Sequence, residues 1–440
     1  MAIRVITTDD PLRDRDVAAL REVLRGGALS AAGQAGDLNV GKIVAQILDQ
    51  VRTGGDKAVS DLTSRLDQAD ITPAGIRVPV DMIEKARSSL EPAFLEVIRA
   101  AADNIRQYQE SILVKDPPPV KRGGRELGLR YTPVRRVGIY VPGGRALYPS
   151  TVLMTVIPAQ VAGVGEIAMA SPPTGGEISP MALALAAELG IEEVYRMGGA
   201  QAIAAMAYGT ESVRSVDKIA GPGNAFVAEA KRQVLGQVGI DSIAGPSEVF
   251  IIADQTPPAE WVAADLIAQA EHNPGSAVLA TTSPELAEKV AAIIDEQLEG
   301  LSRREAASQM LADYSAIIVV PDLDAACDLA NDFASEHLQV MTSDDDAVLA
   351  KIRNAGAVFL GMHSPVPVGD YFAGPSHVLP TGGTARFFGP LSCNDFLKAT
   401  STIRYDAASL YEDAASVAEF ASIEGLTGHA RAIEIRGKGE

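Results

Sequence analysis

Apolar residues recur along the chain at two different spacings, and the change from one spacing to the other divides the chain. Between residues 38 and 51, and again between 94 and 105, they recur every three or four positions, which predicts amphipathic helices. The prolines at 117–119 end this helical segment of roughly 115 residues, because proline lacks an amide proton and fixes φ. The charged stretch 121–136 that follows predicts a strand or a hairpin.

From residue 137 onward, short apolar runs alternate with helical patterns. Each run ends in a turn of small residues, and a helix follows the turn, an order typical of doubly wound parallel sheets. The predicted strands are 137–141, 167–171, 194–197 and 218–220 in a first block, and 245–253, 277–281, 317–320, 338–342 and 357–360 in a second. The tail from Leu391 predicts an extended segment and two helices. The predicted class is α/β, with two Rossmann-like doubly wound domains, a helical N-terminal segment and a small C-terminal tail.

Length and composition limit the class of protein. A chain of 440 residues is too long for one ordinary hydrophobic core, so more than one domain is expected. Its 47% hydrophobic and 22% charged residues match a folded α/β enzyme rather than a disordered chain. The net charge of −19 repels phosphate backbones and anionic lipids, so we expect no nucleic-acid partner and no membrane partner.

Targeting signals and cysteine usage predict a cytoplasmic protein. The N-terminus has no apolar signal-peptide core, and the most apolar stretch, 151–170, is interrupted by a proline, a glutamine and a glutamate. The two cysteines, Cys327 and Cys393, form no Cys-x-x-Cys pair, which argues against a thiolate zinc site. Reduced thiols are therefore the default, and Cys327, in an apolar helix, is expected to pack in the core.

The candidate chemistry is concentrated around the histidines. Only five occur in the chain, and four of them lie in short polar motifs. These four are His272 in Gln-Ala-Glu-His, His337 in Ser-Glu-His-Leu, His377 in Gly-Pro-Ser-His and His429 in Leu-Thr-Gly-His. The fifth, His363, lies a few residues before Asp370. A zinc site with an adjacent acid–base pair is the interpretation that this distribution favours.

Each of these motifs also has a purely structural interpretation. Gln269 and His272 share one face at the end of a helix, where a histidine can simply stabilise the helix dipole. Glu336 and His337 can share proton transfers, but adjacent strand residues point to opposite faces, so a turn must bring both to one site. Without that turn they are a solvated charged pair.

The loop and turn motifs also have both a functional and a structural interpretation. The Gly/Pro-rich loop that contains Asp370 and His377 predicts a ligand and a substrate contact, or else an ordinary polar connector. Glycine turns at 143–144, 198–199 and 221–223 could admit a pyrophosphate next to backbone amides. None of them matches the Gly-x-Gly-x-x-Gly fingerprint, and no acidic partner for a ribose is evident, so they indicate NAD only weakly.

Taken together and in order, these segments closely resemble the histidinol dehydrogenase family over about residues 30–436. The matching segments are 140–144, 198–204, 221–224, 244–249, 269–272, 335–338, 369–371, 377–381 and 426–430. The resemblance implies a zinc-dependent, NAD-linked oxidation of L-histidinol through L-histidinaldehyde to L-histidine, the last step of histidine biosynthesis. It also implies an aldehyde-dehydrogenase-like arrangement of the two Rossmann-like domains.

The resemblance assigns roles to individual residues. It implies that one zinc ion per subunit is bound by Gln269, His272, Asp370 and His429. It implies His337 as the base for alcohol oxidation and Glu336 as the base that activates water. The implied substrate contacts are Ser247, His377 and Glu424 together with the four metal ligands and His337, and the implied NAD contacts are Tyr140, Gln201 and Asn224. Ser376 departs from the asparagine that many relatives carry before this histidine.

The resemblance further implies a homodimer whose sites are shared between subunits, with Glu424 and His429 supplied by the neighbouring tail. The expected domains are 1–139 with 249–390 for the metal and acid–base residues, 140–248 for NAD, and 391–440 as a dimerisation tail. Two alternatives remain: a related zinc and NAD dehydrogenase of another amino alcohol or a sulfonated diol, and a non-catalytic binding protein stabilised by zinc.

Overall fold

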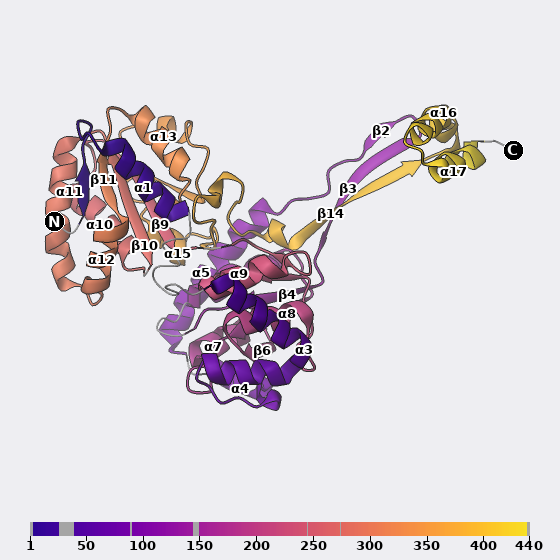
Figure 1. The fold of residues 1–440 in the computed structure, drawn as a ribbon, viewed down its shortest axis with the longest axis horizontal. Helices are drawn as coiled ribbons and strands as arrows, with labels where there is room; N and C mark the ends of the chain where they lie inside the picture. The colour runs from indigo at the N-terminus through magenta and orange to yellow at the C-terminus, as the bar shows by residue number, and fades with distance from the viewer. Residues whose placement is uncertain are drawn as a thin grey trace.

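The computed structural model describes residues 3–25, 39–88, 90–143, 149–243, 245–272 and 274–437. Two parallel sheets with helices on their faces form the body of the molecule, and a long arm projects from it (Figure 1). The predicted α/β class with two doubly wound parallel sheets is confirmed. Within the described ranges, no helix combines the length and the apolar character needed to cross a membrane.

The first sheet contains five parallel strands in the order β6-β5-β4-β7-β8. The strands are β4 (Arg136–Tyr140), β5 (Glu166–Ser171), β6 (Glu193–Arg196), β7 (Lys218–Ala220) and β8 (Gly239–Ile240). All five residues of β4 are buried, which explains why the sequence shows a continuous apolar run here instead of an alternating one.

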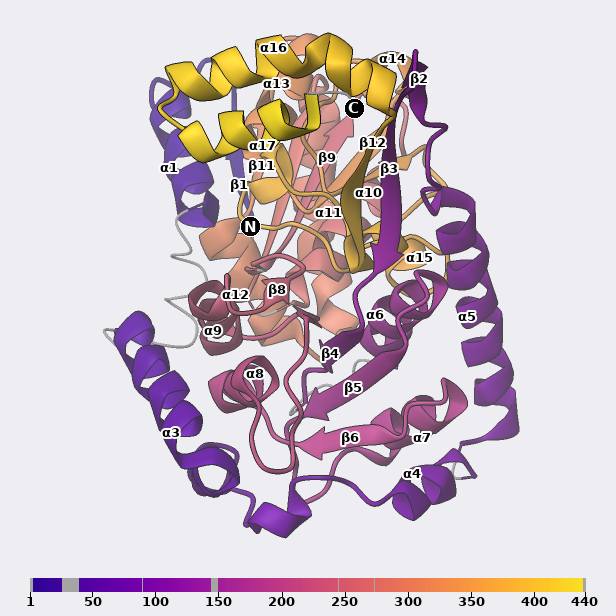
Figure 2. The same ribbon diagram turned by 90° about the vertical axis from the view of Figure 1, so that its right-hand side faces the viewer.

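Helices from the N-terminal half cover this sheet. They are α3 (Val40–Leu66), α4 (Val80–Arg87), α5 (Pro92–Ile112), α6 (Pro149–Val161), α7 (Pro180–Glu188), α8 (Gly199–Tyr208) and α9 (Ala225–Val234), with a 3-10 turn at Pro73–Gly75. α3 packs in one core with α8 and α9, whereas α4 and α5 pack in a second core with α6 and α7. Figure 2 shows α3 and α5 on opposite sides of the sheet.

This packing corrects the first predicted domain boundary. The predicted division grouped residues 1–139 with residues 249–390, but helices α3 to α5 pack against the five-stranded sheet formed by residues 136–240. Helical periodicity identified these helices, but the pattern of apolar positions does not specify which of two apolar sheets receives them.

The second sheet contains six parallel strands in the order β1-β11-β10-β9-β12-β13. The strands are β1 (Arg4–Ile6), β9 (Ser247–Ala253), β10 (Gly275–Thr281), β11 (Ala316–Val319), β12 (His337–Met341) and β13 (Ala357–Leu360). Its helices are α1 (Arg13–Arg25), α10 (Ala259–Ala270), α11 (Pro284–Gln297), α12 (Arg304–Tyr314), α13 (Leu323–Phe333), α14 (Asp345–Leu349) and α15 (Val366–Tyr371), with 3-10 turns at Leu298–Gly300 and Thr384–Arg386. The three-residue strand β1 was not predicted, because so short a segment shows no periodicity. Cys327 is buried in α13, as expected.

The arm joins segments that are far apart in the sequence. β14 (Leu397–Tyr405) pairs antiparallel with β3 (Arg125–Pro133), which forms a hairpin with β2 (Val120–Arg122). The tail continues from a 3-10 turn at Cys393–Phe396 through β14 into α16 (Ala407–Ile423) and α17 (Thr427–Gly437). The predicted hairpin and the predicted order of the tail are therefore confirmed. Figure 1 shows α16 and α17 at the outer end of the arm, away from both sheets.

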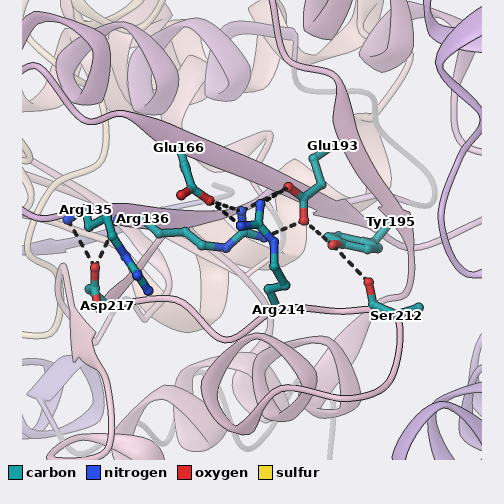
Figure 3. Close-up of polar contacts among 8 residues, drawn as sticks. All are labelled: Arg135, Arg136, Glu166, Glu193, Tyr195, Ser212, Arg214 and Asp217. Carbon is teal, nitrogen blue, oxygen red and sulfur yellow. Dashed lines mark hydrogen bonds and ion pairs between the residues drawn. The ribbon is translucent and has the colours of Figure 1, made fainter.

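A buried charge network stands at the amino edge of the five-stranded sheet (Figure 3). Arg136, at the start of β4, is almost fully buried and pairs with Glu166 at the start of the adjacent β5 and with Glu193 at the start of β6, one strand further. Arg214 pairs with the same two glutamates, and Tyr195 donates its hydroxyl proton to Glu193. Because each carboxylate here has a cationic partner, the network holds the strand ends together and offers no free group for catalysis.

Candidate active site

The predicted catalytic residues gather at the amino edge of the six-stranded sheet. Ser247 begins β9, His337 begins β12, and Glu336 directly precedes that strand. Gln269 lies at the end of α10, just before β10 begins. Ligands of open parallel sheets usually bind at the carboxyl ends of the strands. Here the opposite edge carries the acid–base residues.

A chain of hydrogen bonds joins three of these side chains. Gln269 Nε2 donates to Ser247 Oγ at 2.6 Å, and Ser247 Oγ donates to Glu336 Oε2 at 2.7 Å. The backbone amide of Glu248 donates to the same oxygen of Glu336 at 3.0 Å. Because the Gln269 amide donates through its nitrogen, its Oε1, the atom that an amide offers to a metal, faces a different direction.

His337 is held with one ring nitrogen free. Its Nδ1 lies 2.9 Å from the carbonyl oxygen of Glu248. A carbonyl only accepts hydrogen bonds, so Nδ1 carries the proton and Nε2 is the basic atom. Nε2 is buried, has no hydrogen-bond partner in the described part of the chain, and lies 3.6 Å from Asp370 Oδ1.

The turn required by the sequence interpretation of Glu336 and His337 is present. Because Glu336 precedes the strand that His337 begins, both side chains reach the same site, with Glu336 Oε2 3.5 Å from His337 Nδ1. Both are buried, which rules out a solvated surface pair.

The pKa values in this cluster are coupled through charge. Burial alone would lower the pKa of His337, but the carboxylates of Glu336 and Asp370 outweigh it and raise the pKa to about 9. Burial would raise the pKa of Asp370, but the adjacent His337 imidazole, with His377 and His272 near it, holds this pKa below its usual value. The His337 imidazole lies 3.6 Å from the Asp370 carboxylate.

Two further buried groups complete the electrostatics. Burial lowers the pKa of His377, so this imidazole favours its neutral form. Burial and the charge of Glu336 raise the pKa of Glu248 to about 8. Glu248 is therefore a neutral acid at pH 7, and its side chain accepts a hydrogen bond from the backbone amide of Gly382 at 3.0 Å.

A pocket of about 310 Å³ opens beside His337 and is lined by residues between His337 and Leu379. His337, Phe359, Asp370, Ser376 and His377 contribute to its lining. His377 Nδ1 lies 3.0 Å from the Asp370 carbonyl oxygen, and its Nε2 lies 3.4 Å from Thr151 Oγ1 in α6. Ser376 donates to the Met154 carbonyl at 3.0 Å, so its hydroxyl is used to join the loop to α6.

The described residues supply part of a metal site. They contain no group of three or more His, Cys, Asp or Glu side chains close enough together to hold an ion. Gln269 joins the His337 cluster through Ser247, Asp370 lies 3.6 Å from His337 Nε2, and His272 is near enough to help lower the pKa of Asp370. Their oxygen and nitrogen donors suit zinc, and the uncommitted Oε1 of Gln269 fits a ligand role. His429 lies in α17, at the outer end of the arm (Figure 1).

The predicted cofactor residues lie at the carboxyl edge of the five-stranded sheet. Tyr140 ends β4, and its buried hydroxyl accepts a hydrogen bond from the Gly199 amide at 3.1 Å. Asn224 uses Oδ1 to cap α9, which leaves its NH₂ group for a ligand. Gly221 has φ of +123°, and a Cβ there would lie 2.1 Å from the Tyr140 carbonyl oxygen, so only glycine fits this turn.

A larger cavity of about 460 Å³ lies at this carboxyl edge. Its lining includes Gly143, Pro149, Val152 and Pro172. Pro149 and Val152 belong to the first turn of α6, and Thr151 in the same turn contacts His377 of the smaller pocket. The first turn of α6 therefore lines the larger cavity and contacts a residue of the smaller pocket.

Comparison with known proteins decides the family. A sequence model of the histidinol dehydrogenase family matches residues 31–437. The histidinol dehydrogenase of Rhodopirellula baltica is 48% identical, with 99% of this chain and 97% of the relative covered. That of Bacillus subtilis is also 48% identical, with 90% and 92% covered. The crystal structure of histidinol dehydrogenase from Elizabethkingia anophelis superposes with a TM-score of 0.90 at 33% identity, covering 99% of this chain and 98% of that one.

The chain belongs to the histidinol dehydrogenase family. The resemblance inferred from the motifs is thereby confirmed, and the chain is an oxidoreductase of the dehydrogenase class. The alternative of a non-catalytic binding protein is removed.

Within this member of the histidinol dehydrogenase family, the predicted residues divide into three groups. The body of one subunit brings together Ser247, Gln269, His272, Glu336, His337, Asp370 and His377. Tyr140, Gln201 and Asn224 lie at the neighbouring cofactor edge. Glu424 and His429 are apart from both groups, in the helices at the end of the arm (Figure 1).

Sequence reasoning missed several contributors to the site. Glu248 stood inside a quoted motif, and its position next to Ser247 was the available signal. Thr151 and Asp67 carry no motif at all. Asp67 directly follows α3, and its contact with Gln201 spans 134 positions in the sequence.

Proposed function

We propose that this enzyme oxidises L-histidinol through L-histidinaldehyde to L-histidine, with NAD as the hydride acceptor and one zinc ion per subunit. The observation that carries the proposal is the buried Nε2 of His337, which has no hydrogen-bond partner among the described residues and lines a pocket together with Asp370. An alcohol dehydrogenase needs such a base for the hydroxyl proton and a hydride acceptor within reach.

Gln269, His272 and Asp370 would hold the zinc ion, with His429 of the partner subunit as the fourth ligand. When bound, the ion would supply a fixed attachment point for the imidazole and amine of the substrate. Ser247 supports this role indirectly, because its hydroxyl orients the Gln269 amide. His377 and Glu424 would complete the recognition of the substrate.

In the first oxidation, His337 Nε2 would take the hydroxyl proton of histidinol, and NAD, when bound, would supply the acceptor for the hydride of the adjacent C–H bond. The Glu248 carbonyl keeps Nδ1 protonated, so Nε2 stays the accepting atom. In the metal-free protein the raised pKa would hold His337 protonated at pH 7. A cation held by Asp370 would offset the carboxylate charge that contributes to this pKa.

In the second oxidation, Glu336 takes a proton from a water molecule that attacks the aldehyde carbon. The resulting hydrate loses its hydride to a second NAD and leaves as the carboxylate. One water is consumed, two NADH are formed and three protons are released per histidinol. The hydrogen bonds from Ser247 and the Glu248 amide engage only Oε2 of Glu336, so Oε1 is the oxygen that would face the water.

We further propose that two subunits exchange their tails. The arm carries apolar side chains that the subunit itself leaves exposed, among them Ile403, Phe420 and Ile423, which are 74%, 72% and 78% exposed. Such a surface is unusual for a monomer and suits burial against a second copy. The exchange would bring Glu424 and His429 to the neighbouring pocket.

The division of labour between the two bases is tested by Glu336→Gln. We expect this variant to keep its zinc and its fold and to oxidise histidinol to the aldehyde. It should lose about 100-fold or more of its rate with histidinaldehyde as substrate, because water activation needs the carboxylate. Separate steady-state assays with the two substrates measure this, and an equal loss with both would contradict the assignment.

A further inference from the structure

A partly buried acidic residue lies at the cofactor turn. Asp67 caps the C-terminal end of α3, and its Oδ2 accepts a hydrogen bond from Gln201 Nε2 at 3.0 Å. A hydrogen bond from the Gly198 backbone reaches the same carboxylate. Gly198 and Gln201 both belong to the turn that leads from β6 into α8, one of the glycine turns that the sequence marked as a cofactor contact.

This hydrogen bond determines which way the Gln201 amide faces. An ionised carboxylate only accepts hydrogen bonds, so the NH₂ group of Gln201 must face Asp67. The side-chain oxygen Oε1 is then directed elsewhere. Gln201 is fully buried, and within the described ranges Oε1 has no hydrogen-bond partner. Since an unpaired buried acceptor is costly, this oxygen points to a ligand that supplies a donor.

The glycine turn lies directly against Oε1. A Cβ on Gly199 would lie 2.8 Å from Oε1, so a side chain at this position would crowd the oxygen. A Cβ on Gly198 would lie 2.5 Å from Pro172 Cβ and 3.0 Å from Asp67 Oδ1. Pro172 lines the 460 Å³ cavity, so Gly198 lies between a residue of the cavity wall and the Asp67 carboxylate.

We propose that Asp67 is a positioning residue for the cofactor: it orients Gln201 so that Oε1 accepts a hydrogen bond from a donor group of NAD. The proposal rests on the proposed function, which assigns NAD to this edge of the sheet. The donor is a ribose hydroxyl or the carboxamide NH₂, which share the required chemistry. Phosphate oxygens are acceptors, so Gln201 does not bind the pyrophosphate, although a glycine turn before a helix commonly does so.

Electrostatics agree with a functional role for Asp67. Burial raises the pKa of Asp67 from its ordinary 3.8 to about 6. The folded state therefore penalises the ionised carboxylate, and the penalty is fully present above about pH 6 and disappears below pH 3.8. The titratable group that faces Asp67 is Tyr140, whose own pKa burial raises further above its ordinary value, so it stays neutral. A residue kept at a cost to stability is a candidate for function.

The test is a titration of the full-length, zinc-loaded enzyme with NADH, followed by NADH fluorescence. In Asp67→Asn the side chain can donate as well as accept, so it no longer fixes the orientation of the amide. We expect the Kd for NADH to rise roughly 5- to 10-fold at pH 7.5, the effect of one oriented hydrogen bond. The Tm should stay equal or rise, because the ionised group is gone. Asp70→Asn, an exposed aspartate on the same segment, is the matched control and should change neither value.

Two further arms sharpen the result. The affinity of the wild-type enzyme for NADH should fall as the pH decreases through about 6, while that of Asp67→Asn stays level across this window. Repeating the titration with ADP-ribose, which lacks nicotinamide, separates the two donors. A weakening that persists for ADP-ribose assigns a ribose hydroxyl, and a weakening confined to NADH assigns the carboxamide. Either outcome supports the proposal.

Failure of the proposal can be told apart from failure of the proposed function. If the wild-type enzyme does not bind NADH, the proposed function is wrong. If the wild type binds and Asp67→Asn binds equally well at every pH, only the positioning role is overturned. A loss of affinity that comes with a lower Tm would make Asp67 a structural residue and would also overturn it.

Discussion

At the scale of single residues, the site depends on which atom of each side chain a hydrogen bond leaves free. The Glu248 carbonyl engages Nδ1 of His337 and leaves its Nε2 free. Ser247 and Asp67 engage the amide nitrogens of Gln269 and Gln201, respectively, and leave Oε1 of each for another partner. The motifs predicted His337, Gln269 and Gln201 as site residues. They could not predict the free atoms, because the partners that fix them lie 89, 22 and 134 positions away in the sequence.

The base role of His337 leads to a prediction for His337→Asn. We expect turnover of histidinol to fall by about 100-fold or more, because asparagine cannot replace the buried imidazole nitrogen that takes the hydroxyl proton. Zinc content and NADH affinity should remain at wild-type levels, since the smaller asparagine side chain would still fit the start of β12. His363→Asn, an exposed histidine outside the pocket, is the control for loss of an imidazole as such. Wild-type turnover in His337→Asn would refute the assignment.

At the scale of elements, the spacing of apolar residues was sufficient to predict where strands and helices lie, but not which elements they pair with or pack against. The predicted strand at 218–220 matches β7, and the predicted strands on either side of it agree within a few residues. The pairing of β14 with β3 was not predicted, because an antiparallel partner about 270 positions away leaves no local signal. The prediction of which sheet α3 to α5 cover was wrong for the same reason, because the apolar face of a helix does not specify the sheet that it packs against.

The charge network at the amino edge of β4 to β6 has a consequence for acid stability (Figure 3). Burial would raise the pKa of Glu193, but its hydrogen bonds with Arg136 and Tyr195 outweigh burial and lower the pKa to about 2, from an ordinary 4.5. A lowered pKa in the folded state stabilises the fold above pH 4.5, and that contribution is lost as the pH falls from 4.5 towards 2.

Glu193→Gln should therefore lower the free energy of unfolding at pH 7, by roughly 3 kcal/mol, because Arg136 is buried and loses a charged partner. The deficit relative to the wild type should shrink as the pH falls below 4.5. Urea unfolding at pH 7 and at about pH 3.5 measures both values. Glu192→Gln, an exposed neighbour, should match the wild type at each pH, and a deficit that does not depend on pH would contradict this account.

At the scale of the whole molecule, the body of one subunit holds all the proposed catalytic groups except those of the tail. α16 and α17 stand at the outer end of the arm, with apolar side chains exposed (Figures 1 and 2). The sequence indicated two domains and a tail because the spacing of apolar residues differs between these parts of the chain. The reach of the tail depends on the β3–β14 pairing and was therefore not visible in the sequence.

Sharing of sites between subunits predicts complementation between two inactive variants. His337→Asn damages the body and His429→Ala damages the tail, so each homodimer should be inactive. Unfolding and refolding an equal mixture gives mixed dimers, in which one of the two sites combines an intact body with an intact tail. We expect about a quarter of wild-type activity, since half of the dimers are mixed and half of their sites are intact. Absence of any recovery in refolded mixed dimers would place each tail at its own subunit.

The central claim is that this chain is a four-electron, zinc-dependent enzyme that acts on histidinol. The most direct test is the amount of NADH formed per L-histidinol consumed, measured with the enzyme as purified, after treatment with a chelator, and after zinc is added back. The account predicts two NADH per histidinol, loss of activity on chelation and recovery with zinc. One NADH per histidinol, or full activity after the metal has been removed, would contradict it.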